Sequence, residues 1–214
     1  MAKVTRACKP LTDAQQVRAL EGFVGKHKDR NRALFALGLY SGFRISELLS
    51  LRVKDVYDGH QIRDKITVHA ENMKFGKNEE HKAEPRTVIT NPECVEYLLP
   101  ICKDRDKNDW LFRSQKPDKY GRHRVSRNHA WLVYRGAYEA AGIPRSSHGY
   151  GTHSTRKSFA EFQYQYFGKD LVKVQGMMGH KRIDSTVKYL NKGAEEQKAA
   201  FVAPRLKKRK LDDI

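Results

Sequence analysis

One short segment constrains the fold of this chain more than any other feature. Residues 33–40, Ala-Leu-Phe-Ala-Leu-Gly-Leu-Tyr, are almost wholly apolar, and the Ser-Gly pair at 41 and 42 ends the run. A helix that is apolar on every side is stable only when other elements surround it. A chain of 214 residues buries about 70% of the surface that it exposes when unfolded, so such a cover is available. We therefore expect residues 33–40 to form a buried helix.

Apolar residues at helical spacing predict further helices around this segment. Thr12 and Gln15 have the spacing of a capping box, and Gly25 is expected to end the helix that they begin. Asp170 and Asp184 are expected to cap two later helices. The other predicted helices cover residues 45–51, 92–101, 128–141, 155–166, 171–178 and 185–200.

The pattern changes in the first third of the chain, where two segments alternate with a β-branched bias. Residues 65–70 and 86–90 therefore predict two paired strands, joined by a long polar segment at 72–85. The expected fold class is α+β, mainly α-helical with a small antiparallel β-sheet.

The charge of the chain indicates a polyanionic partner. Lysine and arginine number 42 against 25 aspartate and glutamate residues, which gives a formal net charge of +17. Such an excess is typical of proteins that bind nucleic acid. The sequence has no strongly amphipathic basic helix and no apolar run of about eighteen residues, so we expect no membrane association.

A basic stretch at residues 113–127 has two interpretations, between which the sequence does not decide. It is either a surface that contacts phosphates or a solvated loop, since aromatic side chains do not interleave strongly with the charges there. The candidate DNA-binding residues of this stretch are Arg113, Lys116, Lys119, Arg122, Arg124 and Arg127.

The cysteine content excludes two kinds of stabilising site. Cys8, Cys94 and Cys102 are an odd and loosely spaced set, which excludes a disulfide framework and a four-cysteine zinc site and fits a reducing compartment. Because the sequence also lacks a His-Glu-x-x-His motif and clustered acidic ligands, we expect no metal and no cofactor.

Three short motifs and one lysine together form an ordered set of candidate catalytic residues. Residues 41–48 read Ser-Gly-Phe-Arg-Ile-Ser-Glu-Leu, with Arg44 at a helix start directly after the glycine. His153 and Arg156 are three residues apart, which places them on one helical face or at its entry. Gly179-His180 follows a predicted helix, and Tyr189 lies nine residues after that histidine. Lys74 lies between the two predicted strands.

This ordered set resembles the tyrosine recombinase (phage integrase) family over residues 12–195. Each motif alone is weak, but the order, the intervals and the local structure all agree. Three positions depart from the family pattern: Thr155 and Lys157, where an apolar residue and a histidine are usual, and Met178, where leucine is usual. The resemblance implies the catalytic-domain fold of DNA breaking-rejoining enzymes and a site-specific DNA recombinase that cleaves and rejoins strands.

The resemblance also implies a role for each site residue. Tyr189 attacks a phosphodiester and forms a 3′-phosphotyrosyl link, while Arg44 and Arg156 hold the phosphate through their planar forks. Lys74, with Lys77 as the alternative, protonates the leaving oxygen. The remaining candidates are His153, which takes or shares the tyrosine proton or bonds the phosphate; His180, which bonds the phosphate; Glu47, which orients an arginine or histidine; and Lys157, which adds charge near the phosphate.

Each residue also has an ordinary interpretation. Arg44 alone fits a surface ion pair, and His153 and His180 fit capping or core histidines. Tyr189 fits a core tyrosine, and Tyr164 and Tyr166 are rival nucleophiles, although neither follows a Gly-His pair.

The resemblance sets expectations for organisation and partners. We expect an N-terminal segment at 1–11, a catalytic domain at 12–195, a basic tail at 196–214 and no separate N-terminal core-binding domain. The chain is then either a catalytic fragment or a naturally short member. Double-stranded DNA is the expected partner, with a homo-tetramer on paired sites, a monomer or weak oligomer when free, and possible accessory DNA-bending proteins. The expected location is the cytoplasm and nucleoid of a bacterial or phage host cell.

Two other functions fit the same residues. One is a catalytically inactive DNA-binding regulator with this fold, although such a protein has no use for Tyr189. The other is a topoisomerase-like enzyme that nicks and relaxes DNA.

Overall fold

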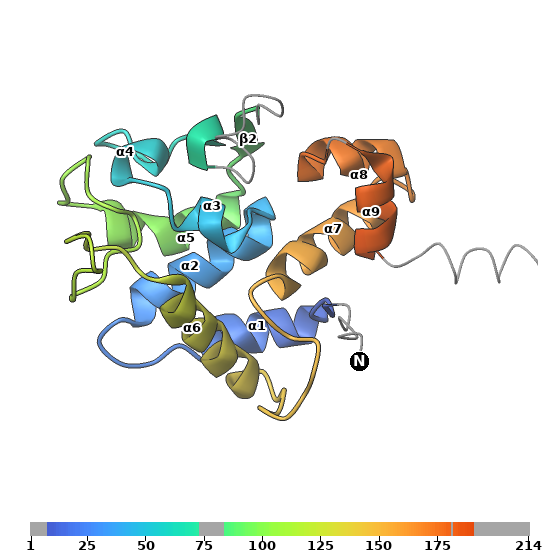
Figure 1. Cartoon of the computed structure of the whole chain (residues 1–214), viewed down its shortest axis with the longest axis horizontal. Coiled ribbons are helices and arrows are strands. Elements are labelled where there is room, and N and C mark those ends of the chain that lie inside the picture. The colour runs from blue at the N-terminus through green and yellow to red at the C-terminus, as the bar shows by residue number, and fades with distance from the viewer. Residues whose placement is uncertain (1–7, 73–83, 181, 191–214) are drawn as a thin grey trace, which may run out of the picture.

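The computed structural model describes residues 8–72, 84–180 and 182–190. A central helix, α2 (Lys28–Ser41), packs against α5 (Pro92–Cys102) and α7 (Ser154–Tyr166), while α1 (Asp13–Glu21) packs against α6 (Arg127–Ala140). Figure 1 shows α1 and α6 below α2, the short helices and the sheet above it, and α7 to α9 to its right. The predicted class, mainly helical with a small antiparallel sheet, is confirmed.

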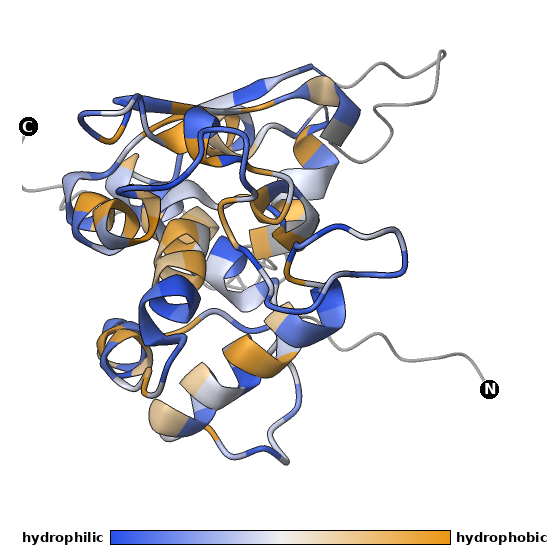
Figure 2. Ribbon diagram, turned by 90° about the vertical axis from the view of Figure 1, so that its left-hand side faces the viewer, coloured by the Kyte–Doolittle hydropathy of each residue, from blue (hydrophilic) through white to orange (hydrophobic). Residues whose placement is uncertain are grey.

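The apolar segment forms the buried helix that the sequence predicts. Residues 33–37 of α2 are all nearly inaccessible to solvent, and the Phe35 ring contacts the rings of Phe23, Tyr134 and Tyr138. The helix begins at Lys28, five residues before the apolar run. The residues of its first turn are polar and at least partly exposed, so the apolar pattern does not mark the start of the helix. In Figure 2, apolar segments gather toward the interior and the peripheral loops are mostly hydrophilic.

Local capping signals predict most helix boundaries, with three exceptions besides the start of α2. The Thr12–Gln15 capping box is present, Asn91 caps α5, and Asp170 accepts two backbone N–H bonds at the start of α8 (Leu171–Met178). However, α1 ends at Glu21 rather than near Gly25. Asp184 is not a cap, because α9 (Ile183–Leu190) already begins at Ile183.

The third exception concerns the segment after the glycine break. Helix α3 covers only Ile45–Leu48 instead of residues 45–51, and a second short helix that the sequence does not predict, α4, covers Val53–Val56. Residues 191–200 of the last predicted helix lie outside the described residues.

The sheet consists of β1 (Lys65–Val68) and β2 (Arg86–Ile89), paired antiparallel as predicted. A short 3₁₀ helix, η1 (Ala70–Asn72), follows β1. Along β2 the inward-facing residues are Arg86 and Val88, and Val68 lies opposite Arg86 in the register. An arginine therefore occupies a core-facing position next to the first turn of the motif at residues 41–48.

A second, smaller core joins α7, α8 and α9 through Phe159, Tyr164, Val174, Met178 and Leu190. It places the end of α8 beside the end of α2, so that motifs distant in sequence become neighbours. Among the described residues, no helix is long and apolar enough to cross a membrane.

Candidate active site

The turn between α2 and α3 presents Arg44. Gly42 has a φ of 59°, and a Cβ there would lie 2.4 Å from the Phe159 ring of α7, so both the backbone and the packing require glycine. The turn then leaves Arg44 as the N-cap of α3, with its side chain 27% exposed. The predicted position of Arg44 at a helix start is confirmed.

Glu47 lies completely buried beneath Arg44. Its Oε1 accepts a 2.7 Å bond from Arg44 Nη1, and its Oε2 accepts a 2.7 Å bond from the Arg44 backbone N–H. Burial by itself would raise the pKa of Glu47, but the backbone and side chain of Arg44, with the charge of Arg156, hold that pKa below its ordinary value. Glu47 therefore stays ionised and orients Arg44, which fits the role expected of it.

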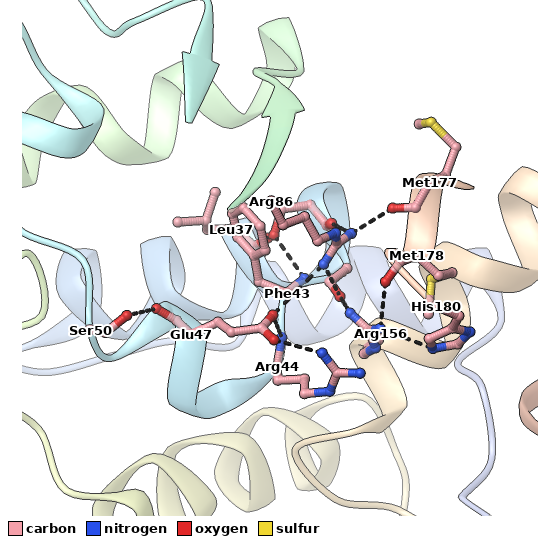
Figure 3. A network of polar contacts seen from close by, with 12 residues as sticks. Leu37, Phe43, Arg44, Glu47, Ser50, Arg86, Arg156, Met177, Met178 and His180 are labelled. Carbon is pink, nitrogen blue, oxygen red and sulfur yellow. Dashed lines mark hydrogen bonds and ion pairs between the residues drawn. The ribbon is translucent and has the colours of Figure 1, made fainter. Parts of the chain in front are cut away.

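Arg156 approaches the same turn from α7. Its side chain is 2% exposed; Nη1 donates to the Gly42 carbonyl, and Nη2 donates to the Met178 carbonyl at 2.8 Å. The guanidinium thus ties α7 to the ends of both α2 and α8, as Figure 3 shows.

His180 follows α8, whose C-terminal Gly179 has a φ of 61°. Its Nε2 lies 3.1 Å from Arg156 Nη2 and its Nδ1 lies 2.9 Å from Thr186 Oγ1. Because a guanidinium only donates, Nε2 accepts, and we assign the ring proton to Nδ1. Burial, followed by the charges of Arg156, Arg44 and Arg86, lowers the pKa of His180 to about 4, so the ring is neutral at pH 7.

His153 is the N-terminal flanking residue of α7 and is exposed. Partial desolvation and then the charges of Arg156, Arg44 and Arg127 lower its pKa. A neutral imidazole is able to accept a proton, which is the chemistry expected of His153. The coupling also places Arg127, at the start of α6, within electrostatic reach of the site.

Arg86, which belongs to none of the sequence motifs, is 6% exposed and central to this cluster. It donates to the carbonyls of Ser41 and Met177, both at 2.8 Å, and its guanidinium lies 4.8 Å from the centre of the Phe43 ring. A usable signal existed, because the alternation of β2 places Arg86 on the same face as the apolar Val88. A charge on that face predicts a buried partner, and Glu47 Oε2 is 3.7 Å away.

The cluster carries an excess of positive charge. The guanidinium groups of Arg44, Arg86 and Arg156 surround the single carboxylate of Glu47, which leaves two net positive charges when the histidines are neutral. A phosphodiester bears one negative charge, and attack by a phenolate brings a second. The arrangement therefore matches the charge of such a transition state.

Of two expected catalytic residues, the structure describes only the backbone of Tyr189 and nothing of Lys74. The backbone of Tyr189 lies in α9, three residues after Thr186, which contacts His180. Lys74 and its alternative Lys77 lie outside the described residues. Within those residues, no group of three or more His, Cys, Asp or Glu side chains is placed to hold a metal ion.

The basic stretch 113–127 is a surface loop leading into α6. Lys116, Lys119 and Arg127 are exposed, whereas Arg113 and Arg122 are partly neutralised by Asp109 at 3.4 Å and Asp118 at 2.8 Å.

Aromatic rings interleave with this loop more than its sequence suggests. The centre of the Tyr120 ring is 4.8 Å from Lys119 Nζ and 4.7 Å from the Arg122 guanidinium, and the centre of the Trp110 ring is 5.2 Å from the Arg124 guanidinium. A hollow of about 470 Å³ opens beside the loop, and no acidic residue is among those that line it: His27, Arg113, Ser114, Gln115 and His123.

Lys157 differs from the other DNA-binding candidates because it is only 7% exposed. It lies in the first half of α7, where every residue from Ser154 to Ala160 is buried. Its burial disfavours direct contact with DNA.

Comparison with known proteins agrees with this geometry. The model of the phage integrase family matches residues 11–196. The chain belongs to the phage integrase family. It is 26% identical over 193 residues to a probable integrase/recombinase, YoeC of Bacillus subtilis, covering 90% of this chain and 94% of that protein. It is also 30% identical over 164 residues to tyrosine recombinase XerD of Oceanobacillus iheyensis, covering 75% of this chain and 49% of that protein.

Solved structures show the same fold. The XerH site-specific recombinase bound to a palindromic difH substrate matches with a TM-score of 0.64 at 24% identity, over 92% of this chain and 54% of that one. The catalytic domain of bacteriophage HP1 integrase matches with a TM-score of 0.55 at 21% identity, over 92% and 96%. The chain thus has the fold of a tyrosine recombinase catalytic domain and spans about half the length of the Xer relatives that it matches.

Proposed function

We propose that this chain is a site-specific DNA recombinase that cleaves and rejoins DNA strands through a covalent 3′-phosphotyrosyl intermediate at Tyr189. The observation that carries the proposal is the meeting of Arg44, His153, Arg156 and His180 at one positively charged site. These residues come from three separate segments of the chain, and Glu47 supports them from below. Family membership and the DNA-bound relatives support the same chemistry.

The proposed reaction exchanges one phosphodiester for another. The Tyr189 oxygen forms a bond to phosphorus, and the bond from phosphorus to the 5′-oxygen breaks. Because a tyrosine of pKa about 10 is about a thousandth ionised at pH 7, the site must supply roughly 4 kcal/mol to the phenolate. His153 takes the phenol proton, and Lys74 or Lys77 donates a proton to the leaving 5′-oxygen.

The two net positive charges of the cluster stabilise the doubly charged transition state. Arg44, at 27% exposure, is the guanidinium most open to a phosphate. Arg156 reaches the phosphate from the α7 side. His180 donates to the phosphate from the end of α8 once its Nε2 gains a proton, which the negative charge of the phosphate favours by raising the pKa of the ring. Attack by a 5′-hydroxyl on the phosphotyrosyl link reverses the chemistry without an external energy source, which permits integration, excision or inversion.

Double-stranded DNA is the proposed substrate and partner. The +17 charge and the exposed Lys116, Lys119 and Arg127 support binding to the DNA backbone, and Arg127 lies within electrostatic reach of His153. We infer that residues 12–195 act as the catalytic domain and that the basic tail at 196–214 adds contacts. We further propose that the chain acts as a homo-tetramer on paired sites, with accessory DNA-bending proteins, in the nucleoid of a bacterial or phage host cell.

Covalent trapping tests the proposal directly. The purified chain is mixed with pooled, nicked fragments of its source genome, quenched in detergent, and examined for DNA that remains on the protein. We expect adducts from the wild type and none from Tyr189→Phe, with binding retained. The matched control is Tyr166→Phe, which removes the same hydroxyl from an exposed residue of α7.

The outcomes separate the candidate functions. Adducts that persist in Tyr189→Phe refute the assignment of the nucleophile. Tight, salt-dependent binding without any adduct favours the inactive regulator. Relaxation of supercoiled DNA without exchange of partners favours the topoisomerase-like enzyme. Sequencing of the trapped DNA identifies the cleavage site.

A further inference from the structure

Arg86 is a buried arginine whose hydrogen bonds reach the two segments that lead to Arg44 and His180. Removing a guanidinium from water is costly unless its donors are satisfied. Here Nη2 donates to the Ser41 and Met177 carbonyls, both at 2.8 Å, and Nη1 donates to the Gly42 carbonyl at 3.2 Å. A strand residue thus binds two chain segments that are distant in sequence (Figure 3).

These carbonyls belong to helix ends. Ser41 is the last residue of α2, and Met177 lies in the last turn of α8. The final carbonyls of a helix have no partner within it and carry partial negative charge, so a guanidinium is well suited to bridge two such ends. Three residues after Ser41 the chain reaches Arg44, and three residues after Met177 it reaches His180. The contact therefore sets the spacing between two of the proposed phosphate-binding residues.

Two more contacts fix Arg86 itself. Its guanidinium packs on the Phe43 ring, directly before Arg44, and lies 3.7 Å from the Glu47 oxygen that accepts the Arg44 backbone N–H. On the other side, a Cβ at Gly179 would lie 3.0 Å from Arg86 Cδ, so the residue before His180 packs closely on its aliphatic stem.

We propose that Arg86 is a positioning residue for strand cleavage. It holds the Arg44 turn and the His180 end of α8 at the separation that one phosphate requires, and it donates no bond to the phosphate itself. The inference rests on the proposed recombinase function.

The planar fork of arginine is essential to this role. One lysine ammonium keeps the charge but lacks the two Nη groups that bridge Ser41, Gly42 and Met177 together. Arg86→Lys therefore removes the bridge between the two segments while it keeps the positive charge. Since misplacement of reacting groups by about 1 Å costs up to about 100-fold in rate, we expect a roughly 10- to 100-fold fall in the cleavage rate constant.

The test is single-turnover cleavage of a nicked suicide duplex that carries the sequence recovered by covalent trapping, at saturating protein. The rate constant reports positioning in the folded molecules. A parallel reaction with the duplex in excess reports, through its amplitude, how many protein molecules are folded, because each forms one adduct. The matched control is Arg105→Lys. Arg105 likewise donates to three backbone carbonyls, of Ile101, Trp110 and Leu111, but none belongs to the candidate site.

The expected result is a reduced rate constant with unchanged amplitude and DNA affinity for Arg86→Lys, and a rate constant within about twofold of wild type for Arg105→Lys. If Arg86→Lys lowers only the amplitude or the melting temperature, the residue is merely structural and the inference is wrong. If the wild type itself yields no adduct, the proposed function fails and the inference fails with it.

Chemical rescue guards against a variant that folds poorly. Arg86→Ala leaves a space that free guanidinium ion fits, so millimolar guanidinium should restore the rate constant, while sodium chloride at equal ionic strength should not. Equal effects of the two salts would also overturn the proposal.

Discussion

The buried carboxylate of Glu47 gives the sharpest stability prediction, through the substitution Glu47→Gln. The carboxylate is 0% exposed and accepts two 2.7 Å bonds from Arg44, and Arg86 Nη1 lies 3.7 Å away. Glutamine keeps the volume but removes the negative charge, and it turns an amide donor toward groups that themselves donate. The guanidinium groups of Arg86 and Arg156 then lose the one carboxylate that offsets their charge.

The magnitude follows from the cost of breaking a buried ion pair, which is about 3–5 kcal/mol. Because glutamine retains one acceptor and Arg44 is partly exposed, we expect the lower end, about 3 kcal/mol. In a domain of this size that loss lowers the melting temperature by about 6–12 °C.

The assay is thermal and urea unfolding of the wild type and of Glu47→Gln at pH 7 and at acid pH. The folded-state pKa of Glu47 is depressed, so its stabilisation is present above its unfolded pKa of about 4.3 and is lost as the pH falls through the folded value. The difference between the proteins should therefore shrink in acid. Glu21→Gln, the same change at an exposed residue, is the control.

A difference below about 1 kcal/mol at pH 7 would refute the reasoning, because it would place Glu47 among ordinary surface substitutions. A difference that persists unchanged in acid would show that the loss comes from packing rather than from charge.

Three further predictions concern other parts of the molecule. The pKa of His180 is about 4 in the folded state and about 6.5 when unfolded. The free energy of unfolding should therefore fall by up to about 3 kcal/mol as the pH drops from about 6.5 to about 4, and His180→Gln should remove that part of the pH dependence in urea titrations. Gly42→Ala should cost about 2–4 kcal/mol because its Cβ meets the Phe159 ring at a positive φ; an unchanged urea midpoint would contradict this. Lys116→Ala should weaken binding to any DNA sequence and reduce the slope of log affinity against log salt by about 0.9, as measured by titration at several salt concentrations. An unaltered slope would mean that Lys116 contacts no phosphate.

The local parts of this protein were predictable from its sequence. Residues 33–40 lie in a buried helix because an apolar surface on all sides leaves no alternative. Helix α8 has the predicted bounds because Asp170 and Gly179 supply the caps within a few residues. The motifs around Arg44, His153 and His180 likewise lie at helix ends, as their spacing indicates.

Tertiary structure decided the contacts between distant segments. Arg86 appears in the sequence as one basic residue in a strand, and its role becomes visible only where α2 and α8 end side by side. Lys157 is expected to add charge near the phosphate, yet the packing of α7 buries it. Periodicity and capping depend on neighbours within a few residues, whereas the environment of a charge depends on which segments the core brings together. The sequence alone therefore determined most of the elements and the order of the motifs, and the packed core determined which charges share the site.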